Sequence, residues 1–188
     1  MKNNISIFRV LFLLFLFLFL LILLPMSYSR YESNTESNIN TTVAHYILNP
    51  GYQYIDVKIP NLVPRDDPYI YNFSISNNRD GTRTETLMEY DLTIKTTTNL
   101  QLDYELYLNE NYQNPNATNI ITTTNIVQDQ YGTYFKEIFT TKSYFTYSYD
   151  ETNNYTLLIY FPKTYINYKY QDIIESIYII IESKQVIQ

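Results

Sequence analysis

Polar and apolar residues alternate without a break along residues 88–95, within the stretch 85–97, and this alternation constrains the fold more than any other feature of the chain. Every second position is apolar, and the positions between are charged or carry threonine. The apolar positions are Met88, Tyr90, Leu92 and Ile94. A period of two is typical of a β-strand with one buried and one solvated face. The stretch therefore predicts a long strand in a sheet that packs on one side.

Shorter segments along the chain have similar patterns and are separated by turn signals. The region around residues 60–68 carries three prolines, and residues 49–51 read Asn-Pro-Gly. Residues 173–182 fit helix or strand, but their β-branched content and the alternation of Ile177, Ile179 and Ile181 favour a strand. The further predicted strands are 43–48, 52–59, 69–76, 100–108, 120–127, 131–140, 144–149 and 155–161. About eight to ten short strands predict one all-β domain, an antiparallel jelly-roll or immunoglobulin-like β-sandwich over 43–188.

The first 29 residues differ from the rest in composition. Fifteen apolar residues, Val10–Leu24, follow Lys2 and Arg9 without interruption, and serines stand at 27 and 29. This is the order of a secretory signal peptide cleaved before Arg30. The alternative is an uncleaved membrane anchor over residues 5–24, because a spanning helix needs roughly 20 residues. Either way the basic residues stay inside, so we expect the remainder to be extracellular or at the cell surface.

Composition excludes several function classes for the part behind the leader. Residues 30–42 are polar without periodicity and are expected to be flexible. Without Lys2 and Arg9, 11 basic residues face 19 acidic ones, a net charge of −8, which argues against nucleic-acid partners. The chain has no cysteine and one histidine, His45, so thiol catalysis, cysteine-bound zinc and multi-histidine sites are excluded. We therefore predict no enzyme activity and no cofactor.

Acidic residues provide two weaker candidate sites. Asp66 and Asp67 follow Arg65 in the proline-rich loop, where they form either a solvated turn or a calcium site completed by backbone oxygens. Carboxylates also alternate along the adjacent predicted strands 85–97 and 100–108, and could cluster on one face. These are Glu89, Asp91, Asp103 and Glu105. An exposed acidic face is the simpler interpretation, since a glycosidase pair would also need a cleft.

Tyrosine is abundant, with 22 residues, and the alternation assigns most of those in strands to the core. Tyr107, Tyr160 and Tyr178 have the outward phase, and we predict them as contacts for a carbohydrate or protein partner. Four Asn-x-Ser/Thr sequons behind the leader matter only in a eukaryotic secretory route. They begin at Asn40, Asn72, Asn116 and Asn154.

Residues 71–108 and 168–186 resemble the camelysin and TasA matrix-fibre proteins, small exported β-sandwiches of Gram-positive bacteria that are processed by a SipW-type signal peptidase. The matching features are the Phe-x-Ile-x-Asn strand end at Phe73–Asn77 and the early segment Ala44–Tyr46. Residues 30–42 form a longer lead than that pattern has. The resemblance implies a non-catalytic cell-surface or biofilm-matrix subunit. It also implies self-association through an N-terminal strand, here Thr41–Leu48, with contact residues Val43, Ala44, Tyr46 and Ile47.

Overall fold

The computed structural model describes residues 39–47, 50–60, 62–166, 170 and 173–186, together with the single residue Leu14. The predicted leader is thus outside the described residues except for Leu14, and so are residues 30–38. No helix within the described ranges is both long and apolar enough to span a membrane.

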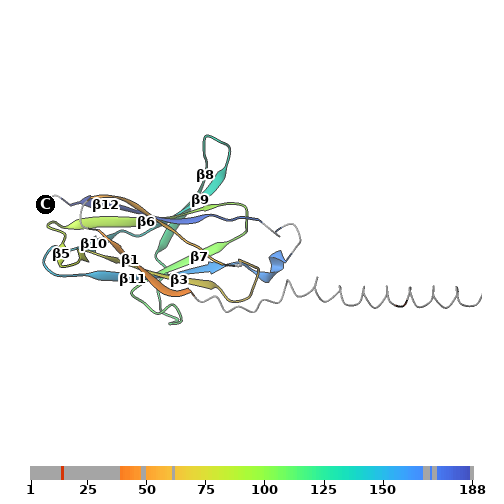
Figure 1. The fold of residues 1–188 in the computed structure, drawn as a ribbon, viewed down its shortest axis with the longest axis horizontal. Coiled ribbons are helices and arrows are strands. Elements are labelled where there is room, and N and C mark those ends of the chain that lie inside the picture. The colour runs from red at the N-terminus through yellow and green to blue at the C-terminus, as the bar shows by residue number, and fades with distance from the viewer. Residues whose placement is uncertain are drawn as a thin grey trace, which may run out of the picture. The chain divides into compact units, whose positions relative to one another are not determined.

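Two β-sheets pack face to face, which confirms the predicted all-β sandwich (Figure 1). Sheet A has four strands, in the order β1 (Ile39–Tyr46), β3 (Tyr69–Ser76), β11 (Thr152–Tyr160) and β7 (Asp103–Leu108). Sheet B has the order β2 (Gly51–Asp56), β12 (Ile177–Gln185), β6 (Met88–Thr97), β9 (Tyr134–Thr140) and β8 (Ile121–Gln128), and β10 (Ser143–Phe145) also pairs with β6. Pairing is antiparallel throughout these sheets except between β1 and β3, which run parallel.

Small elements complete the described fold. A two-stranded ribbon joins β3 to β6, and it consists of β4 (Asn78–Arg79) and β5 (Thr82–Arg83). One short 3-10 helix, η1 (Lys163–Tyr165), follows β11.

The core contains the inward-facing residues that the alternation predicts. In β6 the positions alternate between buried and half-buried along the whole strand. Aromatic rings fill the centre: the rings of Phe73 and Tyr155 stack with centroids 4.9 Å apart, and those of Tyr90 and Phe145 with centroids 4.8 Å apart. The predicted C-terminal strand is confirmed as β12, which lies between β2 and β6 inside sheet B.

Several strand boundaries differ from the prediction. β1 begins at Ile39, so the last residues of the polar stretch 30–42 are strand. β10 ends at Phe145 instead of continuing to Tyr149, because residues 146–151 turn to meet the end of β3.

The expectation that Glu89, Asp91, Asp103 and Glu105 share one face is wrong. Glu89 and Asp91 belong to β6 in sheet B, whereas Asp103 and Glu105 belong to β7 in sheet A. The connection between the two strands crosses from one sheet to the other, and Leu100 and Leu102 are buried along it. The two acidic pairs therefore lie on different sheets.

Candidate functional site

The predicted contact strand lies at one edge of sheet A. Its residues pair in parallel register with β3, as Val43 with Phe73, Ala44 with Ser74 and Tyr46 with Ser76. After the strand, the backbone N–H of Ile47 donates to the carbonyl of Ser76 at 2.8 Å, and the Ile47 side chain is buried in the core. Ala44 is exposed and Tyr46 is half-buried. Leu48 and the side chain of Val43 are outside what the structure describes.

His45 lies within this edge strand, opposite Ile75. Its Nε2 atom is buried and has no hydrogen-bond partner among the described residues. Burial lowers the pKa of the imidazole below its usual value of 6.5. Packing of β1 against β3 therefore buries a polar atom for which the described residues offer no hydrogen bond.

A second group of side chains surrounds Glu105 on the outer face of sheet A. The hydroxyl of Tyr160 donates to Oε2 of Glu105 at 2.7 Å, and the hydroxyl of Tyr107 donates to the same oxygen at 3.1 Å. Burial, followed by the nearby carboxylate, raises the pKa of both tyrosines, so they remain protonated donors. The geometry is a carboxylate held between two phenols, which we call the Glu105 cluster.

The structure brings two of the three predicted contact tyrosines together and separates the third. Tyr107 and Tyr160 belong to the Glu105 cluster, whereas Tyr178 lies on β12 in sheet B, where its ring meets that of Tyr54 edge-on at 6.4 Å. Tyr107 is only 9% exposed. Tyr112 from the 109–119 loop lies beside it, with ring centroids 6.5 Å apart, so Tyr107 offers little surface to a partner.

Sequence reasoning did not single out the role of Glu105 as the centre of this cluster. A signal for it was present, because Glu105 and Tyr107 are two positions apart in one strand and so share a face. Tyr160 could be added only by the pairing of β7 with β11, which sets Tyr160 opposite Asp103 and Leu158 opposite Glu105.

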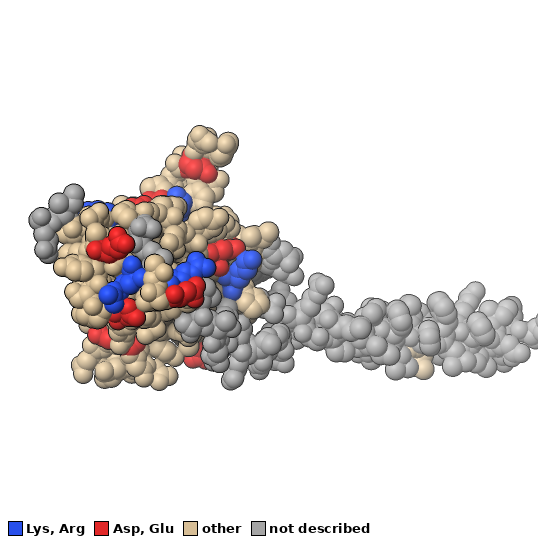
Figure 2. Space-filling view, turned by 60° about the vertical axis from the view of Figure 1, so that its left-hand side comes forward, with Lys and Arg blue, Asp and Glu red and all other residues tan. Residues whose placement is uncertain are grey.

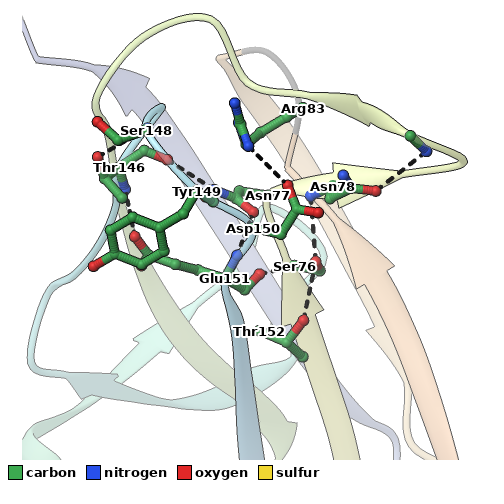
Figure 3. Close-up of polar contacts among 11 residues, drawn as sticks. Ser76, Asn77, Asn78, Arg83, Thr146, Ser148, Tyr149, Asp150, Glu151 and Thr152 are labelled. Atoms are coloured by element: carbon green, nitrogen blue, oxygen red, sulfur yellow. Dashed lines mark hydrogen bonds and ion pairs between the residues drawn. The ribbon is translucent and has the colours of Figure 1, made fainter.

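At the end of β3, a buried amide organises the loop that follows β10 (Figure 3). Asn77 is fully buried, and its Nδ2 donates to the carbonyls of Thr146 at 2.7 Å and Tyr149 at 3.0 Å. Its Oδ1 accepts the backbone N–H of Glu151 at 2.7 Å. All three interactions hold the 146–151 turn against β3. The asparagine that ends the Phe-x-Ile-x-Asn segment thus has a structural role.

Two hollows open on the described surface. One, of about 590 Å³, lies beside the Asn77 turn, where Arg83 forms an ion pair with Asp150 at 3.0 Å. The other, of about 230 Å³, is lined mainly by isoleucine side chains with Glu175 among them. Glu175 is occupied within the fold, since it accepts hydrogen bonds from Thr96 Oγ1 at 2.6 Å and from the Leu100 backbone at 2.9 Å. Neither hollow gathers a set of reactive side chains.

Asp66 and Asp67 make separate contacts in the structure. Asp66 forms an ion pair with Lys163, and the backbone carbonyl of Asp67 accepts a hydrogen bond from Arg65 at 2.7 Å. Within the described residues no group of three or more histidine, aspartate or glutamate side chains could hold a metal ion.

Fold and site together define an all-β sandwich with an edge strand at its N-terminal end and a tyrosine-flanked carboxylate on one outer face. Comparison of the chain with protein-family models, with curated proteins and with solved structures finds no match.

Proposed function

We propose that the chain is an exported, non-catalytic subunit of the cell surface or extracellular matrix, and that copies self-assemble by exchanging β1. The observation that carries this proposal is the position of β1, an edge strand that pairs in sheet A, among the described residues, with β3 alone and in parallel. The resemblance to the camelysin and TasA group supports the same role. Export is supported by the apolar run of residues 10–24 behind Lys2 and Arg9.

Exchange of β1 between copies costs little free energy at this edge. A β1 strand from a second copy would make the same contacts with β3 that the first copy makes, so the free energy of the contacts cancels. Parallel pairs are also slightly less stable per residue than antiparallel ones. In addition, docking buries Nε2 of His45 without a hydrogen-bond partner among the described residues, which reduces the free energy that holds the strand in place.

Paired cysteines test the exchange directly, because the chain has none of its own. Ala44 and Ser74 are partners in the register of β1 and β3. In assembled full-length protein carrying Ala44→Cys and Ser74→Cys, we expect mild oxidation to link different copies. The matched control is Asn72→Cys with Thr156→Cys, a facing pair within β3 and β11 that should link within one copy. If the Ala44–Ser74 bond also forms only within single copies, the exchange proposal is wrong.

Export has its own test. Replacing Leu16 and Leu18 by arginine interrupts the apolar run, and we expect the variant to remain in the cytoplasm of a Gram-positive host. The unaltered chain should be recovered from the cell surface or medium, and its mass shows whether it is cut before Arg30. Export of the doubly substituted chain at the unaltered level would contradict the proposal.

The Glu105 cluster favours a second candidate function, a carbohydrate- or protein-binding module. Aromatic rings stack on the apolar faces of sugars, and a carboxylate accepts hydrogen bonds from sugar hydroxyls. Tyr160 and Tyr112 are half-buried. Tyr160 and Tyr107 both donate to the Glu105 carboxylate, and the ring of Tyr112 lies beside that of Tyr107. The cluster therefore offers an aromatic surface next to an acceptor group.

A glycan array separates this candidate from the first. Tyr160→Ala should abolish a signal that Tyr160→Phe only weakens, since the phenylalanine keeps the ring and loses the hydroxyl. Tyr178→Ala, on the other sheet, serves as the control and should bind as the unaltered protein does. An array without signal for the unaltered protein excludes glycan binding at this cluster.

A further inference from the structure

The free edge of β8 lacks the features that usually prevent edge strands from pairing with other chains. Natural edge strands are guarded by lysine, other charges, proline or strong bulges. β8 reads ITTTNIVQ, with no charged residue and no proline, and residues 122–126 are all exposed. A register irregularity occurs only between Ile121 and Thr123, so the strand is regular from Thr123 onward.

The tip of the hairpin formed by β8 and β9 projects beyond the rest of the sandwich, while β9 also pairs with β6 in sheet B (Figure 1). Among the described residues, β8 pairs only with β9 and ends the order of sheet B. In the space-filling view this projecting hairpin is mostly uncharged, whereas charges of both signs spread over the body of the sandwich (Figure 2). A second chain can therefore approach the edge without a clash with the body.

Hydrogen bonds at the hairpin end show which backbone N–H and C=O groups of β8 face away from β9. The N–H of Asp129 donates to the carbonyl of Thr133 at 2.9 Å, and Gly132 adopts a φ of +87° that closes the turn. Bonded and non-bonded positions alternate along an antiparallel pair. Val127, Asn125 and Thr123 thus bond to β9, and the N–H and C=O groups of Ile126 and Thr124 point to the open edge.

We infer that β8 is a homodimer interface, in which β8 of one copy pairs antiparallel with β8 of a second copy about a two-fold axis at Asn125. In this register Thr124 faces Ile126 of the second copy, and both present free backbone groups. Each residue from 123 to 127 then has a partner within residues 123–127 of the second copy. Asn125 faces its own counterpart at a position without backbone bonds, where side chains come closest.

Charge permits a second copy as the occupant of the β8 edge. The chain carries a net charge of −6, so most contacts between two copies bring acidic groups together. The other edge strand of sheet B, β2, contains Asp56, and edge strand β7 of sheet A contains Asp103 and Glu105. Self-pairing of β8 places no like charges opposite one another. A two-fold contact of this kind closes on itself.

This interface goes beyond the proposed function and does not depend on exchange of β1, since the two strands belong to different sheets. A subunit that uses both contacts has two separate interfaces, and alternating them would extend an assembly beyond a dimer.

A single introduced cysteine tests the interface in the full chain. Asn125→Cys is then the only thiol, and mild oxidation should link two copies rapidly at the two-fold axis. Asn116→Cys, on the exposed 109–119 loop, is the matched control and should link at least about tenfold more slowly, because no interface raises its effective concentration. Equal rates for the two variants overturn the inference.

Charge substitution gives a second readout. Asn125→Lys places two ammonium groups opposite each other, so the protein should sediment with half the mass of the unaltered dimer. Asn125→Thr should remain dimeric. At concentrations where the unaltered protein is monomeric, thermal unfolding should be unchanged in both, since residue 125 is exposed. A dimer that survives Asn125→Lys overturns the inference, even where the Ala44–Ser74 test supports exchange of β1.

Discussion

The hydroxyl oxygens of Tyr90 and Tyr155 lie 2.8 Å apart at the centre of the sandwich and connect β6 of sheet B with β11 of sheet A. Both side chains are 1% exposed. Nδ2 of Asn153 donates to the Tyr90 hydroxyl at 2.6 Å, so the pair is satisfied inside an otherwise apolar core. Burial raises the pKa of both phenols above 10, which keeps them neutral. The pair thus fixes how one sheet faces the other.

Tyr90→Phe should lower the free energy of unfolding by about 1–2 kcal/mol, because the hydroxyl of Tyr155 and the amide of Asn153 each lose a buried partner. Tyr155→Phe should have a similar effect. The double variant should cost less than the sum of the two, since the second change removes a hydroxyl that the first left with only a weaker contact, 3.4 Å from Ser143 Oγ in the case of Tyr155. Urea denaturation of the three variants measures this, and strictly additive losses would contradict it.

Asn77→Ala should cost about 2–4 kcal/mol, because it leaves two carbonyls and one N–H of the 146–151 turn without their buried partner. Asn78→Ala is the matched control. Asn78 accepts only the N–H of Gly81, at 3.3 Å, within an exposed turn, so its loss should stay within about 0.5 kcal/mol. Similar denaturation midpoints for the two variants would show that Asn77 does not hold the turn.

His45 should make the fold less stable in mild acid. Its folded pKa lies below 6.5, so the unfolded chain binds a proton first, and stability falls as the pH drops below 6.5 towards the folded pKa. His45→Leu should remove this part of the pH dependence and be the more stable protein at pH values under 6.5. Because His45 is the only histidine, its imidazole resonances report the midpoint by NMR without assignment. A midpoint above 6.5 would contradict the prediction.

Glu89 should stabilise the fold at pH values above the pKa that its carboxyl group has in the unfolded chain. Its carboxylate accepts hydrogen bonds from Lys142 at 2.7 Å and from the Tyr144 hydroxyl at 3.1 Å, and Lys184 lies 3.1 Å away. The contacts with Lys142 and Lys184 lower the pKa of Glu89 from 4.5 to about 2. This contribution is complete above pH 4.5 and disappears as the pH falls through 2.

Glu89→Gln therefore should unfold earlier than the unaltered protein at pH 5, and the difference should vanish near pH 2. The exposed Glu182→Gln on the neighbouring strand β12 is the control for a general loss of negative charge. Thermal unfolding across this pH range measures both. A difference between Glu89→Gln and the unaltered protein that is constant with pH would contradict the prediction.

The alternation of residues was sufficient to predict the class of fold and the inward face of the central strands. Met88, Tyr90, Leu92 and Ile94 are all buried, and the segment 173–182 is a strand from Ile177 onward, as its β-branched residues favoured. A period of two needs no partner to be recognised, because it follows from the geometry of a single strand. Boundaries were less well predicted, since β1 and β10 begin or end where contacts with β3 and Asn77 require it.

The pairing of strands determined which residues far apart in the sequence come into contact. Alternation gave Glu89 and Glu105 the same outward phase, yet the chain crosses between sheets after β6 and separates them. The same crossing set Glu105 beside Tyr160 on β11, and a second crossing after β11 placed Tyr178 on the other sheet. The sequence by itself thus determined which residues of each strand face the core, because that is a local property of the backbone. Only the tertiary structure decided which outward residues meet, because cross-strand register depends on how buried side chains from both sheets fill one shared core.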